Sequence, residues 1–409
     1  MKIKKKELIT VIIIVVVLAA ILFGAIYLAG RRGKLTNNKP INLYRPIWQE
    51  KIILNHSGVF VVDSENSTIK DLPINLSAFG INDFRKEALM AGNVDGINLY
   101  LSYSYYTNLS ESKDMFFRYN LITSEISEIE FTTAFEMNSN NNFYAHGGYL
   151  YYFGMNFSDY LNAIVNNDPS YLCRVPVTGG EEEVLAEYRN YNERIVLVDG
   201  DSVITSDESS LYAFDVSKKK RTELFNAKNN GFRLILTNRS YYYDGKLYFK
   251  AEKDLPSVVE ADEDFKESWR TPDSYLIALD IKNKKWEKVI DVPVSLFCVT
   301  EDGIFYVKKR YRLLQKTDFA LSVNDVLTVY GDDSICSQPI GGGEERVVYT
   351  NEKISFNEIF SVKNGKLCGR INSPTETDYD YKVKFAVIDF SSKNIAQFDI
   401  SEPTIPAEG

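Results

Sequence analysis

One pattern is written several times along this chain, and it constrains the fold more than any other feature. Two copies show it most clearly, LCRVPVTGGEEEVL from Leu172 and ICSQPIGGGEERVV from Ile335. Apolar residues two positions apart predict a strand with one buried face. When all copies are aligned, one column holds Asp63, Asn120, Pro176, Asp215, Asp280, Pro339 and Asp389. The column recurs every 39 to 65 residues, which indicates a repeat protein.

A second pattern, a tight turn before an aromatic strand, alternates with the first, as in YDGKLYFKA from Tyr243. Asp-Gly, Asn-Gly and Gly-Gly pairs supply the positive φ angles of two-residue hairpins. The turn glycines are Gly96, Gly148, Gly200, Gly245, Gly303 and Gly365. Each repeat therefore reads as strand, tight turn, strand, variable loop, strand, polar turn, strand.

A four-stranded unit repeated every 40 to 60 residues or so is typical of a propeller blade. The chain is therefore predicted to be all-β, a propeller of about seven four-stranded antiparallel blades over residues 43–409. The first copy lacks its opening strand unless Ile41 to Trp48 supplies it, so six or eight blades stay open. A tandem of antiparallel sandwiches would also show many short strands. The register of both patterns through the whole chain favours the propeller.

The N-terminus differs from the rest of the chain. Residues 8–30 carry no charge and would span ~34 Å as a helix, enough for a hydrocarbon layer of ~30 Å. A cleavable signal peptide usually has a shorter apolar region and small residues before its cleavage site, where this chain has Tyr27. We predict an uncleaved transmembrane signal anchor at 8–30, after a short cytoplasmic tail at 1–7 and before a linker at 31–42.

The predicted localisation is the cell membrane, crossed once, with the C-terminal domain extracytoplasmic. Lysines precede the apolar segment and basic residues also come after it, so the positive-inside bias is only slight. An N-terminal apolar segment behind a lysine cluster usually exports the domain that it precedes. The net charge of -9 and the pI of about 5.1 leave no basic stripe for a phosphate backbone, so nucleic acid is not an expected partner.

Cysteines and histidines predict no metal site and no disulfide. Cys173 and Cys336 occupy an alignment column that holds Phe, Tyr, Ile and Ala elsewhere, so the cysteines read as small core residues. The chain has two histidines and no zinc-binding, nucleotide-binding or nucleophile motif. No cofactor and no catalytic residue is predicted. The glutamates of LCRVPVTGGEEEVL read as a solvated edge that discourages pairing between sheets.

A family resemblance becomes visible in LYYFG followed, after a loop, by YLCRVPVTGGEEEVL. The stretch is similar to bacterial membrane-anchored propeller domains that resemble the YWTD propeller of low-density lipoprotein receptor-related proteins, many of which have no assigned function. The resemblance covers residues 51–400 and implies the fold. The aromatic pairs Tyr151 with Tyr152 and Tyr248 with Phe249 lack the Trp-Thr-Asp that comes next in that motif, so no lipoprotein-receptor-like ligand is implied.

Insertions concentrate in the loop between the second and third strands of each repeat. In a propeller these loops emerge on one face, and long loops on a rigid scaffold are where binding usually occurs. Their large amphipathic rings suit interfaces, although each could also cap a blade edge. The candidate binding residues are Tyr105, Tyr106, Tyr160, Trp269, Tyr311, Tyr330, Tyr379 and Tyr381.

Three functions fit these observations. The first is a non-catalytic binding or scaffold module for a protein or polysaccharide ligand of the cell envelope. The alternative is a carbohydrate-active hydrolase or lyase that uses paired carboxylates at the propeller funnel, a chemistry that needs only two carboxylates at the right separation. A sensor or assembly subunit of a membrane complex is a third hypothesis.

Overall fold

The structure, a computed structural model, describes most of the chain after residue 40. The described residues are 41–42, 52–55, 58–63, 68–72, 74–81, 89–108, 111–132, 136–137, 143–155, 169–188, 193–207, 209–253, 273–309, 331–351, 354–374 and 381–399. Within them the chain is all-β, and its helices are two single 3-10 turns, η2 (Ser77–Phe79) and η3 (Lys228–Asn230). The predicted fold class is thus confirmed for the described part.

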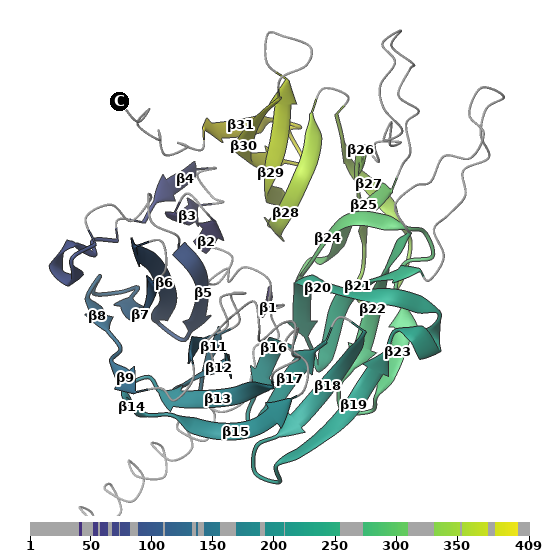
Figure 1. Cartoon of the computed structure of the whole chain (residues 1–409). Coiled ribbons are helices and arrows are strands. Elements are labelled where there is room, and N and C mark those ends of the chain that lie inside the picture. Colours follow the sequence, from purple (N-terminus) through teal and green to yellow (C-terminus); the bar gives the residue numbers. More distant parts are fainter. Residues whose placement is uncertain are drawn as a thin grey trace, which may run out of the picture.

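Six four-stranded antiparallel sheets succeed one another along the chain and stand around a common centre (Figure 1). In each sheet the first strand is the innermost. The first sheets consist of β5 (Leu89–Asp95), β6 (Asn98–Asn108), β7 (Glu111–Asn120) and β8 (Ile126–Glu128), then β11 (Phe143–His146), β12 (Tyr149–Met155), β13 (Ser170–Pro176) and β15 (Glu183–Tyr188), then β16 (Arg194–Asp199), β17 (Ser202–Ser206), β18 (Ser210–Asp215) and β19 (Lys220–Asn226). The remaining sheets consist of β20 (Phe232–Tyr243), β21 (Lys246–Lys253), β22 (Ser274–Asp280) and β23 (Lys285–Lys288), then β24 (Val294–Thr300), β25 (Gly303–Lys309), β26 (Gly331–Gln338) and β27 (Arg346–Thr350), then β28 (Ser355–Lys363), β29 (Lys366–Pro374), β30 (Tyr381–Asp389) and β31 (Ile395–Asp399). These are blades of the predicted kind.

Short strands supplement the blades. β10 (Glu136–Met137) pairs with the far end of β12. β9 (Phe131–Thr132) pairs in parallel with β14 (Gly180–Glu181), so it links the β5–β8 blade to its neighbour.

A three-stranded sheet lies between the first and the last blade. It is formed by β2 (Ile52–Asn55), β3 (Gly58–Asp63) and β4 (Thr68–Asp71). Phe60 packs edge-on against Phe385 of β30, with ring centroids 5.0 Å apart, while Val59 joins the core of the β5–β8 blade. The described residues therefore give six four-stranded blades, and the predicted seven are not confirmed. Of the predicted candidate for the missing strand, Ile41 to Trp48, residues 41 and 42 pair with another blade, and residues 43–48 lie outside the described part.

The aligned turn column has a clear structural role. Asp215 Oδ1 accepts a hydrogen bond from the Lys218 N–H at 2.9 Å, and Asp389 Oδ1 accepts one from the Ser391 N–H at 2.8 Å. Asn120 does the same for Ile122. Short polar side chains that bond their own turn favour chain reversal. The column therefore marks the turn between the third and fourth strands.

The two quoted hairpins share a tyrosine–glutamate hydrogen bond that the sequence did not predict. The buried Tyr152 hydroxyl donates to the Glu182 carboxylate, and the equivalent Tyr306 hydroxyl donates to Glu345. The predicted solvated edge agrees with the exposed Glu181 and Glu183, whereas Glu182 is half-buried and partners Tyr152, because a buried phenol needs a partner.

The cysteines lie where the alignment placed them, in the cores of the blades. Cys173, Cys298, Cys336 and Cys368 are all buried, and each is a free thiol. Their neighbours are apolar side chains of the same and adjacent blades. The prediction that they are small core residues is confirmed.

A fifth strand lies inside the ring. β1 (Ile41–Asn42) pairs antiparallel with Tyr241 and Tyr242 of β20, the innermost strand of its blade, and is drawn near the centre of Figure 1. The predicted membrane helix at 8–30 and the tail at 1–7 lie outside the described residues. In the part of the chain that is described, no helix has the length and apolar character to cross a membrane.

Candidate functional site

The structure places part of the predicted binding set at one end of the propeller. Because every blade is antiparallel, the second-to-third connections all leave at the same end, which we call the loop end; the tight turns leave at the opposite turn end. Tyr105 and Tyr106 lie in β6 and Tyr381 begins β30, all toward the loop end. Five members of the set lie outside the described residues: Tyr160, Trp269, Tyr311, Tyr330 and Tyr379.

The segment expected as a loop after Ser104 is instead a β-ribbon. β6 and β7 keep pairing as far as Asn108 opposite Glu111, with Tyr105 opposite Lys113 and Tyr106 opposite Ser112. Paired backbones hold a ribbon in a defined register, which a loop lacks. Two predicted binding residues therefore lie in a paired strand.

A buried ion pair that the sequence analysis missed lies between two blades, near the loop end. Glu193 directly precedes β16, and its side chain is only 1% exposed. Its Oε1 lies 2.5 Å from Nη2 of Arg221, which comes from β19 of the same blade. A carboxylate this deeply buried is rarely found without a charged partner.

Two tyrosine rings enclose the arginine of this pair. The Arg221 guanidinium carbon lies 3.6 Å from the ring centroid of Tyr212 and 4.4 Å from that of Tyr188. Tyr212 belongs to β18 of the same blade, whereas Tyr188 ends β15 of the neighbouring blade. Cation-π contacts strengthen when water is excluded, so this stack ties the two blades together.

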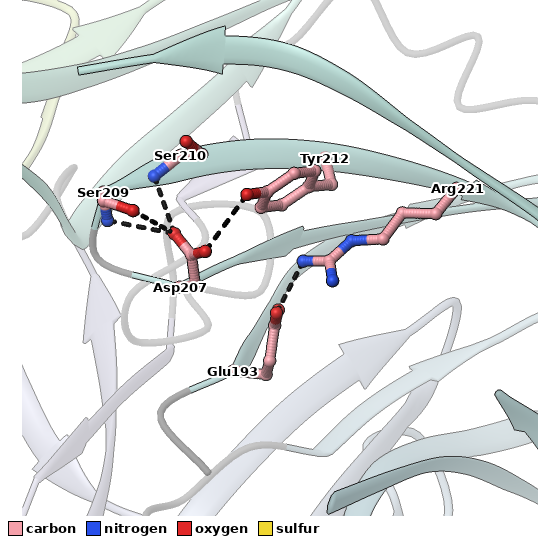
Figure 2. Close-up of polar contacts among 6 residues, drawn as sticks. All are labelled: Glu193, Asp207, Ser209, Ser210, Tyr212 and Arg221. Carbon is pink, nitrogen blue, oxygen red and sulfur yellow. Dashed lines mark hydrogen bonds and ion pairs between the residues drawn. The ribbon is translucent and has the colours of Figure 1, made fainter. Parts of the chain in front are cut away.

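A second carboxylate completes the group. Asp207 comes directly after β17 and accepts the Ser209 and Ser210 N–H groups at 3.1 and 2.8 Å. Its Oδ2 also accepts the Tyr212 hydroxyl at 3.1 Å. Figure 2 shows Asp207 next to the Tyr212 hydroxyl and Glu193 next to the Arg221 guanidinium. We call these residues, with Tyr188 and Thr205, the Glu193 site.

Unused hydrogen-bonding capacity also gathers at the Glu193 site. Two of its buried atoms, Arg221 Nε and the Tyr188 hydroxyl, have no hydrogen-bond partner among the described residues, and the Thr205 hydroxyl lies within hydrogen-bonding reach of Glu193. Buried polar atoms are normally satisfied, and exceptions often mark functional positions. The atoms include donors and acceptors, so the site could bind a small polar group.

Burial shifts the acid-base behaviour of the site. Loss of hydration raises the pKa of Glu193 above its ordinary value; Arg221 opposes the shift and nearby Asp207 adds to it. Burial also raises the pKa of Tyr188 to about 12, against the opposing effect of Arg221. A carboxyl group of raised pKa near a second carboxylate is an arrangement used in general acid catalysis.

The alignment contained a signal for this site. Glu193 stands seven residues before the turn glycine Gly200, and Glu358 stands seven before Gly365. Both glutamates are buried and paired with arginine. In both repeats a glutamate occupies the alignment position at the start of the innermost strand, where an apolar residue is expected. This recurrence is the sequence signal that could have identified the two glutamates.

The second glutamate, Glu358, links two blades on the inner side of the ring. Glu358 of β28 forms an ion pair with Arg239 of β20, and its Oε2 lies 3.5 Å from Nε of Arg370. The Tyr241 hydroxyl also donates to the Phe360 carbonyl at 3.4 Å. Because the β24–β27 blade lies between these two blades along the chain, the contacts bridge blades that are not consecutive.

An open hollow of about 590 Å³ lies at the turn end of the β5–β8 blade. Its walls include Asn98, Arg118, Asn120 and Glu125 from the turns of that blade. This hollow is at the opposite end of the blade from the predicted binding residues. Among the described residues, no cluster of His, Cys, Asp and Glu side chains could hold a metal ion.

Comparisons with known proteins return propellers of low similarity. No family model matches the chain. No curated protein matches it. Among solved structures, the β-propeller domain of the Trilobed protease from Pyrococcus furiosus is 13% identical with a TM-score of 0.41, and 76% of this chain and 84% of that chain are covered.

Two carbohydrate-active enzymes are also similar in structure. Oligogalacturonate lyase from Vibrio parahaemolyticus is 10% identical with a TM-score of 0.43, covering 88% of this chain and 94% of its own. The GH74 xyloglucanase from Xanthomonas campestris is 9% identical with a TM-score of 0.45, covering 88% of this chain and 54% of its own, so the match spans about half of that enzyme. The activities belong to those proteins. The resemblance to YWTD-like propellers stays a prediction.

Proposed function

We propose that this protein is a membrane-anchored, extracytoplasmic β-propeller that binds a protein or cell-envelope polymer through its loop end. The observation that carries the proposal is the asymmetry between the two ends. The β6–β7 ribbon and the β29–β30 ribbon extend toward the loop end with Tyr105, Tyr106 and Tyr381, while tight turns close the other end. Aromatic residues on rigid ribbons lose little entropy on binding, which favours recognition.

The proposal includes two finer points about the scaffold. We place the β2–β4 sheet as the seventh blade, supported by its packing against β30 on one side and the β5–β8 blade on the other. A ring closed in this way would hold the loop-end ribbons at fixed spacing. We also retain the family relationship to YWTD-like membrane-anchored propellers, on the strength of the repeated strand pattern.

Crosslinking and capture from intact membranes, with the full-length protein as bait, tests the binding function. Replacing Tyr106, Trp269 and Tyr311 together by Ala should abolish capture of a specific partner and leave the melting temperature nearly unchanged. A matched control replaces the exposed Ile122 and Val347, which lie away from the loop end, by Ala. Unchanged capture by the triple variant would contradict the assigned face.

The Glu193 site favours a second candidate function, a hydrolase or lyase of polysaccharides. This function is supported by the raised pKa of Glu193, which has Asp207 nearby. Glu193 directly precedes β16, the innermost strand of its blade, at the loop end. The test is incubation of the full-length protein with neutral and acidic polysaccharides, followed by assay of new reducing ends and unsaturated products. Turnover that is lost in both Glu193→Gln and Asp207→Asn would support catalysis here. Absence of turnover on every polymer would leave the binding function alone.

A further inference from the structure

The direction of β1 shows from which end the N-terminal segment enters the ring. β1 is antiparallel to β20, with Ile41 opposite Tyr242 and Asn42 opposite Tyr241. β20 runs toward the turn end, where Asp244 and Gly245 form its tight turn. The chain therefore moves from the turn end toward the loop end as it passes from residue 41 to residue 42. An anchor joined to β1 by a short linker would therefore lead into the ring from the turn end.

The proposed membrane anchor lies a short distance before this point. Residues 31–40 separate the anchor from β1, and ten extended residues reach at most ~36 Å. That reach is comparable to the size of one blade, since seven strand residues already span ~23 Å. A chain that enters at the turn end on so short a tether places the turn end next to the membrane.

The turn end also carries the positive charge that an anionic surface would attract. The third-to-fourth turns of two adjacent blades hold six exposed lysines: Lys218, Lys219, Lys220, Lys282, Lys284 and Lys285. The whole chain has a net charge of -9, so the cluster is a local exception.

Several carboxylates share this end with the lysines. Asp215 lies within the first lysine turn and pairs with Lys218 at 2.6 Å, and Asp280 accepts hydrogen bonds from Asn283 in the second. Asp201 and Asp244 occupy the first-to-second turns, nearer the centre of the ring. The outer turns of these two blades therefore carry more positive than negative charge, whereas the inner turns are acidic at Asp199 and Asp201 and balanced at Asp244 and Lys246.

Two of the lysines occupy backbone positions that lysine does not favour. The φ angles of Lys219 and Lys284 are positive, at 49° and 54°. The aligned residues of two other copies, Ser124 and Lys393, have nearly the same φ, at 61° and 60°, whereas Gly180 and Gly343 differ, at 128° and 140°. A side chain in the left-handed region carries a steric cost that glycine avoids. Because Ser124 and Lys393 take the same φ in other blades, the left-handed residue belongs to this turn type, and only the lysine charge sets Lys219 and Lys284 apart from Ser124.

We propose that the turn end of the β16–β19 and β20–β23 blades rests on an anionic membrane surface, with these six lysines binding lipid headgroups. Each lysine near such a surface adds about a fivefold factor to association. The loop end then points away from the membrane, toward ligands of the envelope. This inference rests on the proposed anchor and adds an orientation to it.

The orientation is tested with the full-length protein in nanodiscs that contain headgroup-attached nitroxide. A fluorophore is placed at Asn283→Cys for the turn end or at Ser209→Cys for the loop end. The two sites are matched, because each side chain is exposed and bonds an aspartate of its own turn. The native thiols are buried. We expect quenching at 283 and little at 209. Equal quenching, or stronger quenching at 209, overturns the orientation.

The role of the lysines is tested by the lipid dependence of the same signal. In the wild type, quenching at 283 should be stronger with phosphatidylglycerol than with phosphatidylcholine alone. Changing all six lysines to Gln should weaken the association of the turn end with the anionic surface by up to about 10⁴-fold, since six fivefold factors multiply. Lys219→Gly with Lys284→Gly, which relieves the backbone cost, should show an intermediate loss. The control Lys228→Gln with Lys253→Gln, at the loop end, should behave as wild type.

Failure of the anchor and failure of the orientation give different results. If alkaline carbonate extracts the full-length protein from membranes, the proposed anchor is wrong. If the protein stays in the membrane but the probe at 283 is not quenched, only the orientation is wrong. If quenching at 283 is present and does not depend on phosphatidylglycerol or on the lysines, the headgroup contact is wrong.

Discussion

Glu193 and Arg221 form one ion pair but stand in different surroundings. The Glu193 side chain is 1% exposed and that of Arg221 is 29% exposed. Removing the arginine leaves an uncompensated charge in the interior, whereas removing the charge of the glutamate leaves an arginine that reaches water and still stacks on Tyr212. The two halves of the pair should therefore contribute unequally to stability.

We expect Arg221→Met to lower the free energy of unfolding at neutral pH by ~3–5 kcal/mol. Glu193→Gln should cost less, about 1–2 kcal/mol, because a neutral amide still fills the site and accepts a hydrogen bond. Urea denaturation of both variants measures the difference. Equal losses would mean that Glu193 is already neutral in the folded protein or hydrated despite its burial.

The pH dependence of stability supplies a separate test of Glu193. Burial raises the pKa of Glu193 above its ordinary 4.5, so the folded state binds this proton more tightly than the unfolded state. The stability that this tighter proton binding contributes is present in full below pH 4.5, and it is lost as pH rises through the folded pKa of Glu193. Relative to Glu193→Gln, the wild type should therefore lose stability on going from pH 4.5 upward. A constant difference across that range would contradict the shift.

At the scale of the element, the third-to-fourth turn depends on a side chain that the alignment had already singled out. Hydrogen bonds from the Ser391 hydroxyl and from the Ser391 and Ser392 N–H groups lower the pKa of Asp389 to about 2. In Asp215 the Lys218 ammonium is the main cause of a similar lowering of the pKa. The carboxylate form thus fits these turns better than the protonated form.

The sign of this effect predicts behaviour in acid. The folded pKa of Asp389 is below the unfolded value of 3.8, so its contribution is present above 3.8 and lost as pH falls toward about 2. Asp389→Asn should fold at neutral pH, since Asn120 forms the equivalent turn, and should show less loss of stability over this acid range. Denaturation midpoints at several pH values measure this. If Asp389→Asn loses as much stability in acid as the wild type, the turn does not stabilise the ionised form of Asp389.

The elements show how far sequence reasoning reached. Strand periodicity and turn dipeptides predicted the blades. A sheet face that is buried requires apolar residues at every second position, and a positive φ favours glycine, so both features can be read from short stretches of sequence. The aligned column found the polar turns. The Tyr152 to Glu182 contact was missed, since it joins residues whose proximity depends on how one strand pairs with the next. The extension of the β6–β7 pairing to Asn108 and Glu111 was missed as well, because the polar run of residues 107–114 lacks the apolar alternation that predicts a strand.

At the scale of the whole molecule, sequence could predict the ring but not the contacts inside it. The Glu193 site joins two blades, and Glu358 joins residues 119 positions away in sequence. No local pattern encodes such contacts. Only the shared spacing of Glu193 and Glu358 before their turn glycines pointed to them. The aromatic residues predicted for binding lie largely outside the described residues, so that assignment stays a prediction.

Glu358 provides the test of how the ring holds together. It is 3% exposed and contacts two arginines, Arg239 from a non-consecutive blade and Arg370 from the adjacent strand. Glu358→Ala should lower the free energy of unfolding by ~3–5 kcal/mol, because it leaves two positive charges facing each other where water is scarce. Replacing all three residues with apolar residues, as Arg239→Met, Glu358→Leu and Arg370→Met, should restore most of that loss, since buried charges cost hydration that apolar packing does not. Urea denaturation compares the two variants. The opposite outcome is a triple variant as unstable as Glu358→Ala. In that case the ion pairs contribute net stability beyond offsetting the cost of burying their own charges. The contact between non-consecutive blades would then be a main source of the stability of the ring.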